Sequence, residues 1–146
     1  MTREQNRAKY AYEATSKVSK EVREDYTNMA LRFPALVRSA GLAQAFAFVL
    51  SRGKEGHVKF INDLACALFK LDVKGGSDPI DMECVRAEDW RSENAADEYF
   101  KIVRIAKLPV YIRMTREVLA MADWFKRFVQ SAPESDSESK HEKPAT

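Results

Sequence analysis

Residues 33–50 read FPALVRSAGLAQAFAFVL, and this run decides how the chain folds. It carries one charge, Arg38, in a chain of which 32% is Asp, Glu, Lys or Arg. A membrane-spanning helix needs about 20 apolar residues, so the run is nearly long enough. Pro34, Arg38 and Gly41 interrupt it, and an arginine at the bilayer centre would cost roughly 2.5 kcal/mol or more. We therefore interpret it as two buried helical pieces of a core, joined by a bend.

The composition around this run favours an all-α fold. The chain has 146 residues, which suffices for one ordinary domain with its own hydrophobic core. Hydrophobic residues make up 45%, and there are only five glycines and five prolines. This balance suits helices better than a turn-rich sheet. We predict a compact bundle of about six helices that forms a single domain over residues 1–131.

Local signals place these helices along the chain. Thr2 and Gln5 have capping-box spacing, which predicts a first helix of about five turns ending near residues 23–26. Thr27 or Asn28 then caps a second element. Pro34 either kinks this element or starts a new helix. We predict four further helices: one over about 42–51, one after Gly56, one capped by Ser92 or Asn94, and one with Pro109 in its first turn.

Two segments lack a helical pattern. Residues 72–91 contain Gly-Gly, Asp-Pro and scattered acids, which predicts an acidic surface loop. Residues 132–146 are rich in Ser, Glu and Lys and contain no large apolar residue. We expect this C-terminal tail to be disordered.

Charge is unevenly distributed along the chain, although the formal net charge is only +2. Residues 26–54 and 99–116 contain Lys and Arg but no acid, whereas residues 72–98 contain nine acids and three cations, a balance of minus six. Five cations within these two basic segments are notable because they have no acid three or four residues away, so no partner on their own helix. These five are Arg32, Arg38, Arg104, Lys107 and Arg116.

Unpaired cations of this kind suit a phosphate backbone, which attracts Lys and Arg without regard to base sequence. Alternatively, the acidic loop folds back over them. Arg113, Arg116 and Arg127 also share one stripe of the last predicted helix, with Trp124 beside it. That tryptophan could stack on a base, but packing within the fold is the favoured interpretation.

No pattern typical of catalysis is present. The chain has no GxGxxG, GxxxxGK[ST], HExxH or GxSxG motif. Cys66, Cys84, His57 and His141 are too scattered for a zinc site, and His57 is expected to be exposed or to cap a helix. We expect no catalytic residue, no metal and no cofactor. The polar opening MTREQNRAKYAYE is unlike a secretory leader, so we expect a cytoplasmic protein with reduced thiols.

Three stretches together resemble a known family. They are QNRAKYAYE at 5–13, RFPALVRSAGLAQAFAFVLSRG at 32–53 and REVLAMADWFKRFVQ at 116–130. In this order and at these separations they resemble the small helical subunit of the Cmr complex, the type III-B CRISPR effector. The likeness covers about two-thirds of the chain, and the middle block is the most specific. The long acidic loop and the tail depart from the family's compact pattern.

The resemblance implies a non-catalytic subunit with a helical-bundle fold that acts in antiviral defence. Copies of it stack beside a larger filament, and the groove between the filaments receives guide and target RNA. The implied partners are other Cmr subunits, further copies of this chain, guide RNA and target RNA, with no membrane and no small-molecule substrate. The alternatives are a scaffold subunit without direct RNA contact and the small subunit of the related type III-A complex.

Within the matching blocks, the resemblance points to Arg7 and Arg38 as RNA contacts, and Arg127 falls in the family's WFKRF motif. The other candidate RNA contacts rest on the charge argument alone. These are Arg32, Arg104, Lys107, Arg113 and Arg116.

Overall fold

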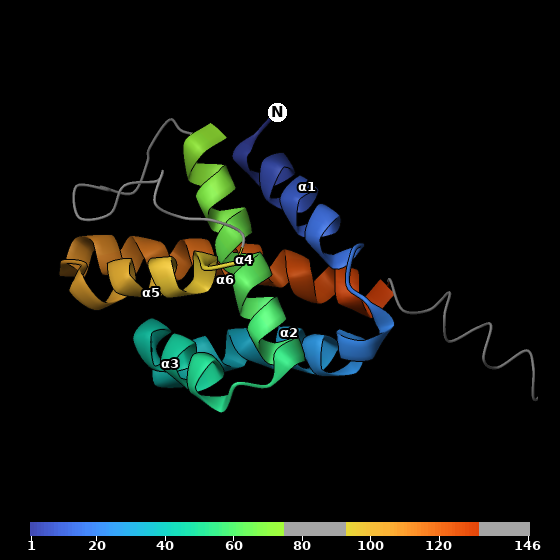
Figure 1. Cartoon of the computed structure of the whole chain (residues 1–146). Coiled ribbons are helices and arrows are strands. Elements are labelled where there is room, and N and C mark those ends of the chain that lie inside the picture. The colour runs from blue at the N-terminus through green and yellow to red at the C-terminus, as the bar shows by residue number, and fades with distance from the viewer. Residues whose placement is uncertain (75–92, 132–146) are drawn as a thin grey trace, which may run out of the picture.

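A central helix, α4 (Glu55–Lys74), packs against each of the other five helices. The structure is a computed structural model that describes residues 1–74 and 93–131, with only the backbone considered at 72–74. Figure 1 shows α4 crossing the molecule, with α1 on one side of it and α2 and α3 beyond its N-terminal end. The other elements are α1 (Arg3–Thr15), α2 (Lys20–Ala40), α3 (Leu42–Arg52), α5 (Ala95–Ile105) and α6 (Leu108–Ser131).

The described residues form six helices and no strand, which confirms the predicted all-α bundle. Aromatic rings join the elements at the centre of the core. Phe60 of α4 lies edge-on to Phe33 of α2 at 5.4 Å and to Phe125 of α6 at 5.8 Å between ring centroids. Phe46 of α3 stacks on Tyr99 of α5 at 5.5 Å. Edge-on and offset ring pairs of this kind stabilise a core beyond the area that they bury.

The predicted C-terminal end of the first helix is wrong. The capping box of Thr2 and Gln5 is present, but α1 ends at Thr15 and α2 begins at Lys20. The apolar spacing continues across this break, because Thr15 and Val18 are both buried and keep the helical interval. Residues 20–26 therefore belong to α2, and Thr27 and Asn28 lie inside that helix rather than capping one.

The opening stretch forms two buried pieces, as predicted, with the bend at Gly41. Pro34 lies inside α2, which continues to Ala40 without a new start. Gly41 has a φ of +92°, a conformation that other residues rarely adopt, and it separates α2 from α3. Val37, Leu42 and Phe46 on either side of the bend are all buried. The large apolar residues of the run therefore belong to the hydrophobic core.

The last two helices begin near the predicted positions. Asn94 precedes α5, and Pro109 lies in the first turn of α6. The acidic loop was predicted from residue 72, but α4 continues to Lys74. The rest of that loop and the tail at 132–146 lie outside the described residues, so the single-domain organisation stays a prediction. None of the helices in the described part combines the length and the hydropathy that crossing a membrane would need.

Candidate nucleic-acid interface

The structure brings together half of the cations that were predicted to bind RNA. They lie where the end of α2, the end of α5 and the first turns of α6 meet. We call this group the cationic end, and its members are Arg38, Arg104, Lys107 and Arg113.

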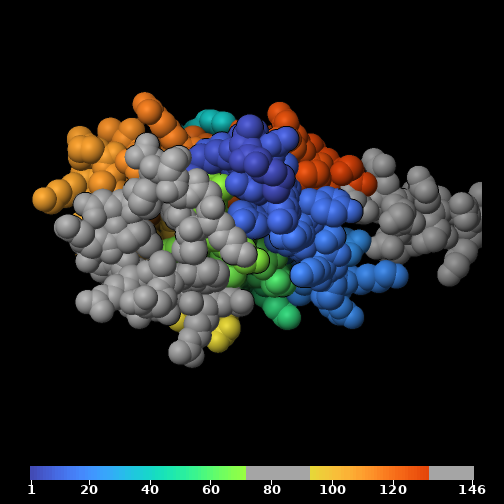
Figure 2. Space-filling model, turned by 90° about the horizontal axis from the view of Figure 1, so that it is seen from above, coloured from blue at the N-terminus to red at the C-terminus, as the bar shows by residue number. Residues whose placement is uncertain are grey.

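A hydrogen bond between α3 and α6 explains why residues distant in sequence meet here. The backbone N–H of Ala43 donates to the hydroxyl of Tyr111 at 3.1 Å. Ala43 lies two residues after the bend at Gly41, so this contact holds the end of α2, and Arg38 with it, against the start of α6. The start of α6 lies at one end of the molecule in both overall views, in orange (Figures 1 and 2).

The cationic end is solvent-exposed. Within residues 1–71 and 93–131, no ion pair is recorded for Arg38, Arg104 or Lys107. The guanidinium of Arg104 lies over the ring of Phe100 at 4.8 Å, a cation–π contact. Lys101 differs, because its ammonium pairs with Glu98 at 3.0 Å.

Three other predicted cations lie outside this group. Arg116 follows Arg113 by one turn of α6, and Arg32 lies on α2 before the bend; both are exposed and have no recorded ion pair with the described residues. Arg127 lies near the C-terminal end of α6, where its guanidinium covers the ring of Trp124 at 5.1 Å. Of these three, only Arg116 lies close to the cationic end along its helix.

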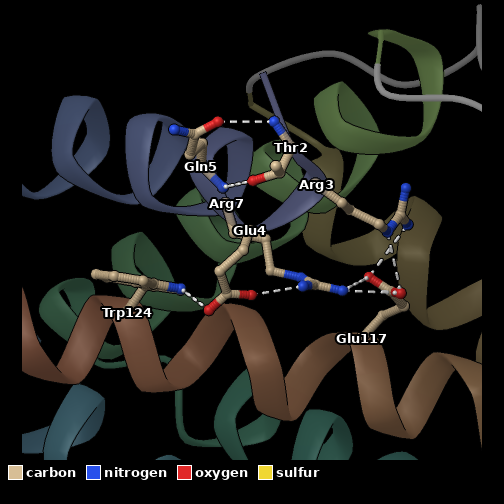
Figure 3. A network of polar contacts seen from close by, with 7 residues as sticks. All are labelled: Thr2, Arg3, Glu4, Gln5, Arg7, Glu117 and Trp124. Carbon is tan, nitrogen blue, oxygen red and sulfur yellow. Dashed lines mark hydrogen bonds and ion pairs between the residues drawn. The ribbon is translucent and has the colours of Figure 1, made fainter.

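Arg7 has a different environment, in a polar network that joins α1 to α6 (Figure 3). Its guanidinium pairs with Glu4 at 2.7 Å and with Glu117 at 3.1 Å, and its side chain is only 14% exposed. Arg3 binds the same Glu117 carboxylate at 3.1 Å. These contacts account for Arg7 without RNA, so its RNA contact stays a prediction.

Trp124 belongs to the same network. Its indole N–H donates to Glu4 at 2.7 Å, and this hydrogen bond is the main reason why the pKa of Glu4 is lowered. Its ring also stacks on Phe128 at 5.7 Å between centroids, and Tyr12 meets Phe128 edge-on. These contacts favour the packing interpretation of Trp124 over base stacking.

Sequence reasoning missed an apolar patch beside the cationic end. Ile105, Leu108 and Ile112 expose 56%, 69% and 44% of their surface. They span the connection from α5 to α6, and we call them the apolar corner. A signal was present in the sequence, since Ile105 and Leu108 directly follow the cations Arg104 and Lys107.

A second missed feature is a groove of about 300 Å³ between α1 and α4. Its lining includes Tyr10, Lys17, Lys59, Asp63 and Lys70. Asp63 accepts hydrogen bonds from the Tyr26 hydroxyl at 2.9 Å and from Lys59 at 2.7 Å. Lys59 thereby compensates the charge of the Asp63 carboxylate.

His57 departs from its predicted exposure. It lies in the first turn of α4 with only 5% of its surface exposed, and its Nδ1 atom has no hydrogen-bond partner among the described residues. Burial lowers the pKa of the imidazole. Among the described residues no cluster of His, Cys, Asp and Glu is arranged to hold a metal ion. Cys84 and His141 lie outside the described residues.

Comparison with known proteins agrees with this helical architecture. The model of the family described as CRISPR-associated protein (Cas_Cmr5) matches residues 3–132. The chain belongs to the Cmr5 family. It is 44% identical over 131 residues to the CRISPR system Cmr subunit Cmr5 of Thermus thermophilus, a match that covers 89% of this chain and 95% of that protein.

A solved structure is similar as well. The crystal structure of a CRISPR-associated Cmr5 family protein from Thermus thermophilus has a TM-score of 0.69 and 43% sequence identity, and the match covers 90% of this chain and 96% of that one. The predicted resemblance is therefore confirmed, and with it the choice of the Cmr family over the type III-A small subunit.

Proposed function

We propose that this Cmr5-family chain is a non-catalytic small subunit of the Cmr complex, a type III-B CRISPR effector of antiviral defence. In this proposal copies of the chain stack within the complex and line the channel for the duplex of guide and target RNA. Membership of the Cmr5 family supports the place in the complex. Other Cmr subunits and further copies of the chain are the protein partners.

One observation supports the RNA contact most strongly. Cations that have no recorded ion pair with the described residues lie at one end of the bundle. Arg38 is exposed near the end of α2, Arg104 and Lys107 are exposed around the connection from α5 to α6, and Arg116 lies further along α6. Positive groups without an ion pair among the described residues are suited to phosphates, which they attract whatever the base sequence. Base pairing would supply the sequence specificity.

The other cations that were predicted to contact RNA support the proposal less strongly. Arg32 and Arg127 are exposed, but they lie away from the cationic end, and Arg127 also covers Trp124. The guanidinium of Arg7 already forms ion pairs with the carboxylates of Glu4 and Glu117. We therefore propose Arg38, Arg104 and Arg116 as the principal contacts to RNA backbone, with Lys107 and Arg113 beside them.

A scaffold function without direct RNA contact is the second candidate, and the apolar corner is the observation that favours it. Aliphatic side chains in the midst of exposed cations are typical of a protein interface rather than of a phosphate-binding surface. The two candidates differ in whether the exposed cations contact RNA, and the following test distinguishes them.

The test is target RNA capture by a Cmr complex reconstituted with the triple variant Arg38→Glu, Arg104→Glu, Arg116→Glu. We expect capture to weaken and its dependence on salt concentration to become shallower, since fewer phosphates are neutralised. The matched control is Lys9→Glu, Lys17→Glu, Lys20→Glu, which makes the same change in charge at exposed residues outside the cationic end. Normal assembly with unchanged capture and an unchanged salt slope for the triple variant would contradict direct RNA contact and leave the scaffold function.

A further inference from the structure

The start of α4 carries positive charge where a helix attracts negative charge. The carbonyl oxygen of Lys54 accepts a hydrogen bond from the N–H of Val58 at 2.9 Å, so Lys54 occupies the N-cap position of this helix. The lysine ammonium is a donor only and satisfies none of the N–H groups that begin α4. Because the N-terminus is the positive end of the helix dipole, a cation is unfavourable there and an anion is favoured.

Two further cations surround the same helix start. Arg52 ends α3, two residues before Lys54, and Arg32 lies on α2. Burial is the main reason why the pKa of His57 is lowered, and the charges of all three cations lower it further, so they lie around this imidazole. All three residues are exposed, and no ion pair is recorded for any of them with the described residues.

The imidazole of His57 is an independent observation that points to an anion. Only 5% of this residue is exposed, and its Nδ1 atom has no hydrogen-bond partner in the described part of the chain. Buried polar atoms in proteins are nearly always hydrogen-bonded, so an exception calls for an explanation. The nearby acids are Asp25, which raises the pKa of His57, and Glu55 in the first turn of α4. Three cations thus face two acids around a buried imidazole.

The backbone holds this group together. A Cβ atom at Gly56 would lie 2.5 Å from Cβ of Asp25, so the start of α4 lies directly against α2. Arg32 follows Asp25 by seven residues, two helical turns, and therefore shares its face of α2. In Figure 1 the connection from α3 to α4 lies at the lower edge of the molecule, whereas the start of α6 lies at the left. The group is therefore separate from the cationic end.

We propose that the start of α4 is a binding site for a phosphate group, held by Arg32, Arg52 and Lys54. A phosphate suits the place because it compensates several cations at once, accepts hydrogen bonds from guanidinium groups and favours the positive end of a helix. The phosphate belongs either to a free or terminal phosphate, which is a dianion, or to the backbone of RNA. The proposal goes beyond the RNA contact at the cationic end and does not depend on it.

The first test is a titration of the isolated full chain with inorganic phosphate, followed by NMR of the histidine side chains at constant ionic strength. We expect the His57 signals to shift and saturate, with a Kd of about 1 mM. We also expect the pKa of His57 to rise at saturating phosphate, because a nearby anion favours the charged imidazole. His57→Gln assigns the signals, since it removes them.

Matched variants locate the site. The site variant is Arg32→Gln, Arg52→Gln, Lys54→Gln. The control variant removes the same charge at the cationic end and is Arg38→Gln, Arg104→Gln, Lys107→Gln. We expect the site variant to bind phosphate about tenfold more weakly or not at all, and the control to bind it as wild type does. Circular dichroism confirms that each variant is folded, and Lys54→Gln alone provides the same comparison at an exposed residue if the triple site variant is not.

Two further ligands identify the source of the phosphate. Uridine 5′-monophosphate carries a terminal dianion, whereas the dinucleotide UpU carries one phosphodiester and no terminal phosphate. Tighter binding of the monophosphate would assign the site to a free or terminal phosphate, and binding of UpU with equal affinity would assign it to RNA backbone.

Three results would overturn the inference. The first is an absence of saturable shifts of His57 in up to about 10 mM of all three ligands. The second is an unchanged pKa of His57 at saturating phosphate, which would place the bound anion elsewhere. The third is an equal loss of binding in the site and control variants, which would show general attraction by positive charge. Capture of target RNA by the Cmr complex tests the cationic end separately.

Discussion

At the scale of single residues, Glu117 decides how α1 is held. Its carboxylate binds the guanidinium groups of both Arg3 and Arg7 at 3.1 Å, and its side chain is only 15% exposed. Replacing Glu117 by Gln would leave two cations at the α1–α6 contact without their shared anion. We expect Glu117→Gln to lower the free energy of unfolding by about 2 kcal/mol, measured by urea denaturation.

The matched control is Glu24→Gln, at an exposed carboxylate on α2 without a recorded ion pair among the described residues. An exposed substitution of this kind should change the free energy of unfolding by less than about 0.5 kcal/mol. Equal effects of the two changes would mean that Glu117 does not hold α1.

His57 is expected to make stability depend on pH. Burial is the main reason why its pKa is lowered; Lys54, Arg52 and Arg32 lower it further, while Asp25 opposes them. A group with a depressed pKa contributes stability above its unfolded value, 6.5, and that stability is lost as the pH falls through the folded value. We therefore expect the free energy of unfolding to drop more between pH 7 and pH 5 in wild type than in His57→Gln. Equal drops would contradict this assignment.

The same residues show why the site was only partly predictable. Arg38 was recognised because it is the only charge in an apolar run, a property visible in the sequence. Arg7 has one partner that spacing could find, Glu4 three residues away, and one that it could not, because Glu117 is 110 residues away and meets Arg7 only when α1 packs on α6. Spacing rules find acids three or four residues away on one helix. They do not find ion pairs between helices.

At the scale of elements, Gly56 sets the approach of α4 to α2. A Cβ atom at this position would lie 2.5 Å from Cβ of Asp25 and 2.8 Å from the carbonyl oxygen of Val22. Alanine favours a helix by up to about 1 kcal/mol over glycine, but here the two helices would have to move apart. We expect Gly56→Ala to lower the free energy of unfolding by about 2 kcal/mol, in urea denaturation.

Gly53 is the matched control for that change. Nothing lies within 4 Å of a Cβ atom there, but its φ of +68° makes alanine strained. Gly53→Ala should therefore cost only about 1 kcal/mol, the strain of the backbone. A Gly56→Ala protein as stable as wild type would show that the two helices do not need this close approach.

The elements themselves were predicted where apolar spacing and a breaker residue agree. Gly41 and Gly53 bound α3, and the predicted helix over 42–51 differs from it by one residue. The break between α1 and α2 was missed because no proline or glycine marks residues 16–19 and the apolar spacing continues through them. Ser19 precedes α2 without a side-chain capping hydrogen bond, so the usual cap signal is weak there.

At the scale of the whole molecule, the fold followed from composition, while the functional surface depends on tertiary placement. An apolar run with one charge identifies a core segment by itself. The cationic end required the end of α2 to lie against the start of α6, which the hydrogen bond from Ala43 to Tyr111 indicates and the sequence does not. The apolar corner likewise became visible only when its three side chains were found outside the core.

The central claim is that Arg38 faces RNA in the assembled Cmr complex. The most direct measurement replaces Arg38 by a photocrosslinking amino acid, reconstitutes the complex with guide and target RNA, irradiates it, and identifies what is attached to this chain. Lys17, exposed just after α1, is the control position. We predict crosslinks to RNA from position 38 and none from position 17. Crosslinks from position 38 to protein alone would contradict the claim.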